Sequence, residues 1–176
     1  MSEIMSEVTS DVITGVEITI RPYQDGDAQA ISDLITNIQR TEFDINITLD
    51  EQSDLANING FYGEGSSGFW VAAAGDKVVG TIALLDITQN DAALRKMFVA
   101  SDYRGNGLGV AEKLLNHMFD QARMNGIQNI YLGTTPDFKA AHRFYEKHGF
   151  VRYSKTDLPP RFPILTVDSW FYHKSV

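Results

Sequence analysis

Residues 104–109 read Arg104-Gly105-Asn106-Gly107-Leu108-Gly109, and they follow an apolar segment that ends at Val99. From Leu108 onward, apolar residues recur at helical spacing as far as Asn125. The predicted order is therefore strand, glycine-rich turn, helix. The first N–H groups of a helix have no intrahelical partners and lie at the positive end of its dipole, so such a turn suits an anion. Glycine permits positive φ, and the Arg104 guanidinium adds donors for phosphate oxygens.

Two familiar nucleotide-binding patterns do not fit this turn. The dinucleotide fingerprint needs G-x-G-x-x-G, and the glycines here alternate instead. A P-loop needs a lysine after its last glycine, where this chain has Val110. A phosphate site of another kind remains, with a tight turn that binds no ligand as the alternative.

The hydrophobic pattern along the rest of the chain predicts a mixed sheet with helices on both faces, in α/β (α+β) style. We expect a loose leader over residues 1–16 and a single domain over 17–176. The expected strands are 17–21, 69–74, 77–87, 92–99, 127–132, 150–154 and 164–173. The expected helices are 27–39 capped by Asp27, a short one near 49–58, 108–125, and one to His148 with Thr135 as N-cap and Pro136 next.

Composition excludes several classes of function. The 176 residues carry a formal net charge of −8, which repels phosphate backbones, so nucleic acid is not an expected partner. Cysteine is absent and no His/Asp clustering is seen, so we expect no metal and no thiol nucleophile. No apolar run is long enough for a membrane span, and no signal peptide is evident, so we expect a cytoplasmic protein.

The turn resembles motif A of the GCN5-related N-acetyltransferases (the GNAT family), Q/R-x-x-G-x-G/A, with Arg104, Gly107 and Gly109 at its fixed positions. Further on, Ala141–Phe150 resembles the family's motif B, and the two motifs have the family's order and separation. The resemblance covers about residues 69–150. It implies the GNAT fold, a mostly antiparallel sheet splayed between its fourth and fifth strands.

The resemblance also implies how acetyl-CoA binds. The backbone of the fourth strand is expected to pair with the pantetheine arm, and the turn to hold the pyrophosphate. The implied cofactor contacts are Met97, Phe98, Val99, Arg104, Gly105, Asn106, Gly107, Leu108, Gly109 and Tyr145. Many family members have an Asn where this chain has Phe138, so that contact is not carried over.

Tyr145 is the candidate catalytic residue. The resemblance places it near the CoA sulfur, and a phenol can donate a proton to a leaving thiolate. The alternative is that Tyr145 only packs in the core.

The general base stays open, because Ala93 stands where many relatives have a Glu. The candidates are Glu42, Asp44, Asp86, Asp91 or a chain of waters; His142 and His148 are expected at the surface. Side chains that could wall the acceptor site are Phe43, Phe61, Tyr62, Trp70, Arg161 and Phe162.

We therefore expect an N-acetyltransferase that moves the acetyl group of acetyl-CoA to a primary amine of a small molecule or amino acid, by direct attack in a ternary complex. A protein lysine or N-terminal acetyltransferase and a non-catalytic acetyl-CoA sensor are the alternatives. Acetyl-CoA is the expected co-substrate, without a metal, and pairing into a homodimer is left open.

Overall fold

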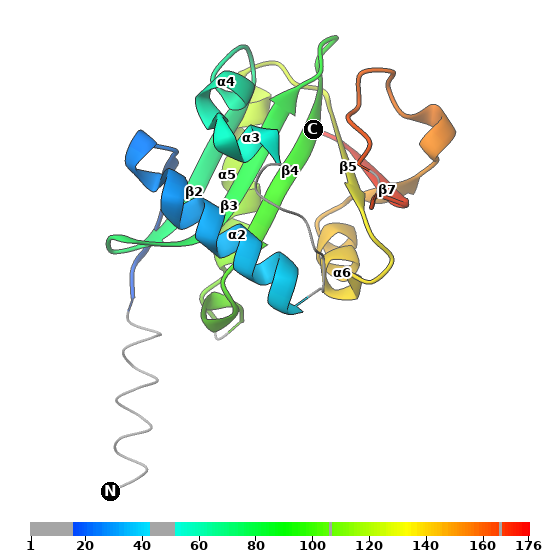
Figure 1. Ribbon diagram of the computed structural model, residues 1–176. Coiled ribbons are helices and arrows are strands. Elements are labelled where there is room, and N and C mark those ends of the chain that lie inside the picture. Colours follow the sequence, from blue (N-terminus) through cyan, green and yellow to red (C-terminus); the bar gives the residue numbers. More distant parts are fainter. Residues whose placement is uncertain (1–15, 43–51, 106, 166) are drawn as a thin grey trace, which may run out of the picture.

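The computed structural model describes residues 16–42, 52–105, 107–165 and 167–176 (Figure 1). This part of the chain forms one seven-stranded sheet in the order β1-β2-β3-β4-β5-β7-β6. The strands are β1 Ile18–Pro22, β2 Gly68–Ala74, β3 Lys77–Asp86, β4 Asp91–Val99, β5 Asn129–Thr134, β6 Val151–Tyr153 and β7 Trp170–Ser175. The pair β4–β5 is parallel and the other pairs are antiparallel, so the predicted mixed sheet is confirmed.

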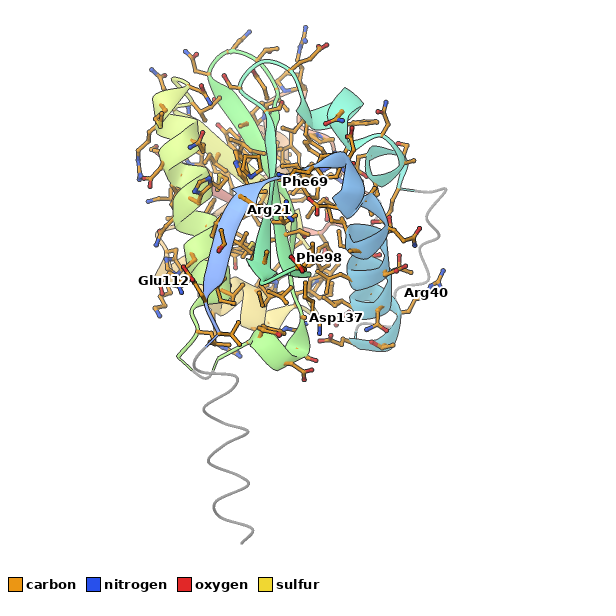
Figure 2. All side chains as sticks on the ribbon, turned by 90° about the vertical axis from the view of Figure 1, so that its left-hand side faces the viewer. Arg21, Arg40, Phe69, Phe98, Glu112 and Asp137 are labelled. Atoms are coloured by element: carbon orange, nitrogen blue, oxygen red, sulfur yellow. The ribbon has the colours of Figure 1, made fainter. Side chains whose placement is uncertain are left out.

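Helices cover both faces of this sheet. They are α2 Ala28–Glu42, α3 Ser53–Ala56, α4 Ile58–Tyr62, α5 Val110–Met124 and α6 Lys139–Lys147. Short 3₁₀ turns occupy Asp25–Asp27, Ser101–Tyr103 and Lys155–Asp157. Seen from the side, the sheet stands between α5 and α2 (Figure 2).

Alternation along β2 shows why both faces are buried. Trp70 and Ala72 pack into the cluster that contains the apolar stripe of α5, whereas Phe69 and Val71 pack with α2 and α4. Successive side chains of a strand point to opposite faces, so one strand contributes side chains to the core on each face of the sheet. A third cluster of buried side chains extends the α2 face under the loop that precedes β7.

The sheet opens between β4 and β5. Their ladder runs only from the pair Asp91↔Asn129 to the pair Ala93↔Tyr131, although β4 continues to Val99 and β5 to Thr134. The predicted splay between the fourth and fifth strands is therefore confirmed. Beyond Ala93, the edge of β4 that faces β5 has no neighbouring strand within the described residues.

A bulge bends β4 just after the opening begins. Thr81 of β3 pairs with Phe98 and Ala83 pairs with Arg95, so the register shifts between them. Lys96 has φ +55°, and its carbonyl accepts a 2.6 Å hydrogen bond from the Thr81 hydroxyl. Bulges redirect backbone and side chains locally, here at the splayed end of the strand.

Two predicted boundaries are wrong. Helix α6 begins at Lys139, because the Thr135 carbonyl closes a turn to the N–H of Phe138 and the Thr135 hydroxyl caps nothing. Strand β7 begins at Trp170, because the Asp168 carboxylate accepts the N–H of Leu165 and turns the chain before it pairs with β5.

The helix expected near 49–58 is interrupted at Asn57, whose side chain accepts the N–H of Gly60 and starts α4. Asp27 lies directly before α2, and its carboxylate binds Arg21 and the N–H of Gln24. Residues 1–15 of the expected leader, 49–51 of the short helix, and Phe43, Asp44 and Asn106 lie outside the described residues.

Candidate active site

The glycine turn lies at the splayed end of β4. Gly105, Gly107 and Gly109 have φ values of +69°, +73° and +60°, which L side chains adopt at a cost. A Cβ on any of them would meet nothing within 4 Å, so the backbone conformation demands glycine and crowding does not. Leu108 is buried in the α5 core, and α5 begins at Val110. The turn is thus anchored on its core side and open on the other, with the helix N-terminus beside it.

Arg104 is tied to the protein. Its Nε donates to the Val99 carbonyl at 2.8 Å, and its two terminal nitrogens pair with the Glu42 carboxylate, at 3.0 Å for Nη2 to Oε2. The guanidinium thereby links the turn to the end of β4 and to the last residue of α2. Its predicted contact with phosphate stays a prediction, and in this structure its side chain fixes the turn.

Met97, Phe98 and Val99 occupy the part of β4 that has left β5. Met97 packs against the α5 core and Phe98 against the α2 core, so the side chains divide between the faces. Their backbone runs along the opening, which is the position that the sequence predicts for a pantetheine contact.

Tyr145 belongs to α6, and its side chain is buried in the core. Its ring packs edge-on against Phe144 and Phe150, with 5.6 Å between ring centroids in each pair. Its hydroxyl makes no hydrogen bond to the described residues. Burial raises the pKa of Tyr145, so the phenol stays protonated at neutral pH and its hydroxyl is a hydrogen-bond donor.

The predicted bases that can be placed are already engaged. Asp86 accepts the N–H groups of Ser66 and Thr88, at 3.1 and 2.8 Å. Asp91 accepts the Asn129 amide at 3.1 Å, and Glu42 pairs with Arg104. These carboxylates hold loops and strand ends together, which removes the reason for choosing one of them as the base.

The expected surface position of His142 is wrong. Its side chain is 5% exposed, with Nε2 2.8 Å from the Thr135 carbonyl and the ring stacked on Trp170 at 4.3 Å. Arg152 lies over the same Trp170 ring at 3.7 Å. The ring stacked on His142 comes from β7 and the guanidinium beyond it from β6, so sequence spacing around His142 gave no sign of them. His148 is half-buried against Phe144.

A group of largely buried polar side chains, of which the sequence analysis singled out only Tyr62, lies on the α2 face of the opening. We call Gln52, Asp54, Tyr62, Arg95 and Lys96 the Asp54 cluster. Asp54 accepts the Tyr62 hydroxyl at 2.7 Å and pairs with Lys96 Nζ at 3.4 Å and Arg95 Nη2 at 3.8 Å. Lys96 Nζ also donates to Gln52 at 3.0 Å. Two adjacent basic residues inside an otherwise apolar strand were the signal available in the sequence.

Burial sets the protonation tendencies in this cluster. It lowers the pKa of Lys96, although the Asp54 carboxylate opposes the shift. It raises the pKa of Tyr62, which stays a neutral donor to Asp54. Charged groups are buried here at a desolvation cost that their mutual contacts offset.

Asp168 lies on the other side of the opening, against β5. A Cβ on Gly133 would lie 2.6 Å from its Oδ2, so glycine at this position lets the carboxylate approach the strand. The same oxygen accepts the N–H of Leu165 at 3.2 Å. Burial raises the pKa of Asp168, while this hydrogen bond and then the charges of Arg95 and Lys96 oppose the rise. Like most of the Asp54 cluster, Asp168 was not identified by sequence reasoning.

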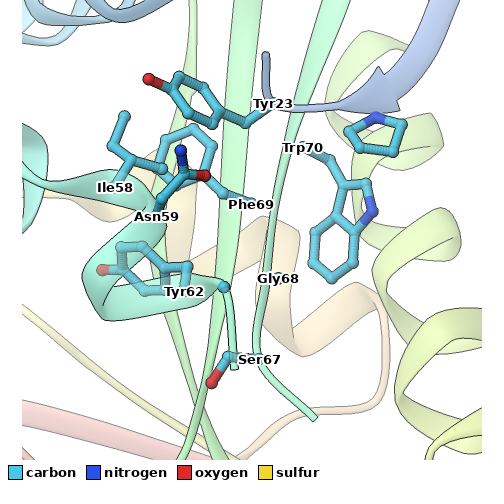
Figure 3. A pocket seen from close by; sticks show the side chains of 10 residues that line it. Tyr23, Ile58, Asn59, Tyr62, Ser67, Gly68, Phe69 and Trp70 are labelled. Carbon is cyan, nitrogen blue, oxygen red and sulfur yellow. The ribbon is translucent and has the colours of Figure 1, made fainter. Parts of the chain in front are cut away.

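Two surface hollows lie away from the opening. The first, of about 270 Å³, is lined from the end of β1, α4 and the start of β2, with Tyr62, Phe69 and Trp70 in its walls (Figure 3). The second, of about 620 Å³, lies between α6 and the β6–β7 pair. Neither is lined by β4, by β5 or by the glycine turn, so we do not assign either to the chemistry.

The aromatic acceptor candidates are dispersed. Tyr62 alone among those that the structure places belongs to the Asp54 cluster, whereas Trp70 faces α5 beside His117 at 5.9 Å. Phe162 is buried against Phe171, and Phe61 and Arg161 are exposed.

Comparison with known proteins places these features in context. A family model described as "Acetyltransferase (GNAT) family" matches residues 33–150. An N-acetylaspartate synthetase of Danio rerio is 36% identical over 107 residues, which is 60% of this chain and 37% of that protein. The chain therefore spans little more than a third of that relative's length.

Two solved structures match over nearly the whole chain. A GNAT acetyltransferase from Staphylococcus aureus Mu50 has a TM-score of 0.86 and 38% identity, covering 90% of this chain and 99% of that one. An acetyltransferase from Streptococcus agalactiae 2603 also has a TM-score of 0.86, with 32% identity, covering 90% and 98%. Within the described residues no helix is long and apolar enough to cross a bilayer, and no group of acidic or imidazole side chains is arranged to hold a metal ion.

Proposed function

The chain belongs to the GNAT family of acetyltransferases, and on that premise we propose that it transfers the acetyl group of acetyl-CoA to a primary amine of a small molecule or amino acid. The observation that carries the proposal is the open glycine turn at the splayed end of β4. We propose direct attack by the amine in a ternary complex, since cysteine is absent from the whole sequence and no thiol can form an acyl-enzyme.

The site fits the shape and charge of a CoA diphosphate. Three glycines with positive φ leave open space where a Cβ would stand, so a ligand can approach the backbone closely. The N-terminus of the 15-residue helix α5 adds N–H donors and the positive end of a dipole. In this proposal residues 104–109 hold the pyrophosphate, and the unpaired edge of β4 at 97–99 aligns the pantetheine arm.

Bound acetyl-CoA supplies the acetyl group as a reactive thioester. Tyr145 is the proposed acid. Its phenol is neutral at physiological pH, as phenols ordinarily are, and burial raises its pKa further. Its hydroxyl has no partner among the described residues to compete for the proton. A proton from Tyr145 to the departing sulfur lets CoA leave as the neutral thiol and avoids the build-up of thiolate charge.

A small acceptor is favoured over a protein acceptor by the names of the relatives, which include N-acetylaspartate synthetases. Cytoplasmic location, pairing of two copies and the single domain over 17–176 stay predictions.

Two measurements on the purified full chain test the proposal. The first is calorimetric titration with CoA and acetyl-CoA, for which we expect saturable binding. The second is thiol release from acetyl-CoA in the presence of a panel of amines, amino acids and peptides. Binding with no thiol release for any acceptor would favour the sensor alternative, and absence of binding at millimolar CoA would overturn the proposal.

A further inference from the structure

Two basic side chains of β4, Arg95 and Lys96, are largely buried at the opening and share one carboxylate in direct contact among the described residues. Arg95 and Lys96 have side chains only 15% and 8% exposed, and both pair with one carboxylate, Asp54, which is 5% exposed. Two cations thus share one anion. A buried charge is stabilised by direct pairing, so the carboxylate of a ligand at this place would give the two cations a second direct partner.

Arg95 has the capacity to bind that anion. A guanidinium carries five N–H donors, and its one contact among the described residues is the 3.8 Å approach to Asp54, too long for a hydrogen bond. Its side chain also keeps some exposure, so a ligand can reach it. A planar fork of donors matches a carboxylate in two parallel hydrogen bonds.

An acidic group faces these two cations from the β5 side. Asp168 lies against Gly133, and the charges of Arg95 and Lys96 are close enough to affect its titration. Arg95 follows Ala93 by two residues, and Ala93 packs in the same cluster as Phe171, which contacts Gly133. Side chains two apart on a strand share a face, so the basic and acidic groups lie on one face of the sheet, on opposite sides of the opening.

Given the proposed acetyltransferase activity, on which this inference rests, we propose that the acceptor is an amino acid. Its carboxylate binds Arg95 and Lys96 on β4, and its amino group faces Asp168, which accepts the proton. Opposite charges on the two sides of the opening suit a molecule that carries both a carboxylate and an ammonium group, and the two cations of β4 disfavour a polyamine.

The proton and electron balance follows from these positions. Asp168 takes one proton from the ammonium group, and the freed nitrogen pair forms the bond to the acetyl carbon as the carbon–sulfur bond breaks. Tyr145 gives its proton to the departing sulfur and regains one from the new amide nitrogen. Asp168 releases its proton to water, so one proton appears in solution for each amide formed.

The first test compares acceptors that differ only in the negative charge. Initial rates of thiol release are measured for wild-type protein with L-aspartate, L-glutamate and L-alanine, and with the corresponding amino-acid amides and spermidine. We expect at least one amino acid to exceed its amide by about 100-fold in kcat/KM, in the range expected when one partner of a buried, hydrogen-bonded charge pair is removed. Equal or faster turnover of the amides or of spermidine would overturn this inference and leave the proposed function intact.

The second test uses variants with matched controls. Arg95→Gln should raise the KM of the preferred amino acid about tenfold or more, with acetyl-CoA binding unchanged, and Arg95→Lys should recover part of the loss. Arg123→Gln removes the same charge from the exposed surface of α5 and should match wild type. Asp168→Asn should lower kcat more than it raises KM, with Asp120→Asn as its exposed control.

Binding of the preferred amino acid to the protein alone, measured by calorimetry, gives a readout that does not depend on turnover. Wild type should bind it and Arg95→Gln should not. If thermal melting shows that Arg95→Gln is poorly folded, the comparison of acceptors with wild-type protein still tests the inference. Absence of CoA binding and of all thiol release would instead contradict the proposed function.

Discussion

The glycine turn and the Asp54 cluster are built in opposite ways. The turn lies within six consecutive positions of the sequence, and its three glycines have positive φ with open space where a Cβ would stand. The Asp54 cluster draws side chains from α3, α4 and β4, and it is buried and mutually bonded. One half of the opening offers backbone donors to a ligand, and the other offers charged side chains.

The difference suggests a division of labour. Backbone donors suit a group that every catalytic cycle shares, because side-chain changes hardly affect them. Charged side chains suit the acceptor, because each one adds or removes a specific partner. Substitutions in the cluster should therefore change stability and acceptor choice, and substitutions in the turn should change cofactor affinity.

The largest expected effect is on stability, from Asp54→Ala. It removes the one carboxylate that is in direct contact with Arg95 and Lys96 among the described residues, which should cost about 3–5 kcal/mol of unfolding free energy. Denaturant unfolding followed by circular dichroism measures it. Asp120→Ala, which breaks an exposed ion pair with Arg123, should cost under about 0.5 kcal/mol. Similar losses for both variants would show that the cluster is not a stabilising unit.

The next effect concerns catalysis rather than folding. Tyr145→Phe should lower kcat about 100-fold, because it removes the proposed acid, while the affinity for acetyl-CoA changes little. Stability should be nearly unaffected, because the hydroxyl has no partner among the described residues. Tyr172→Phe is the control, since it loses a 3.1 Å bond to Glu146 and should keep its turnover. Wild-type turnover in Tyr145→Phe would leave Tyr145 with a packing role only.

A smaller effect separates strain from ligand binding in the turn. Gly107→Ala and Gly75→Ala both place a side chain at positive φ in open space, at +73° and +60°. Each should lose about 1 kcal/mol of stability. Gly107→Ala alone should weaken acetyl-CoA binding, by about tenfold or about 1.4 kcal/mol. Calorimetric titration of both variants with acetyl-CoA measures this difference. Equal affinities of the two variants for acetyl-CoA would show that the turn is not part of the binding site.

The smallest effect concerns Arg104. Glu42→Gln removes the charge that holds its guanidinium, in a pair whose side chains are 41% and 28% exposed. We expect a stability loss below about 1 kcal/mol and less than about a threefold change in acetyl-CoA affinity. A large gain in affinity would mean that Arg104, once released, binds the phosphate with its side chain.

Much of the fold could be predicted because hydrophobic period and glycine position are local signals. Strands β1 to β5 and helices α2 and α5 lie where the pattern places them, to within a few residues. The starts of α6 and β7 could not be predicted, because they depend on particular hydrogen bonds. The Thr135 carbonyl accepts the N–H of Phe138, and the Asp168 carboxylate accepts the N–H of Leu165, and residue propensities do not describe such bonds.

By itself, the sequence determined the glycine turn, since its six residues are adjacent and positive φ is a property of glycine, and it determined the two-sided core through alternation. Only the tertiary structure decided which charges meet. Asp54 and Lys96 are 42 positions apart in the numbering, and Asp168 reaches the opening only because a loop returns it beside Gly133. Packing of the whole chain brings such groups close together. The local conformational propensity of each residue carries no information about these contacts.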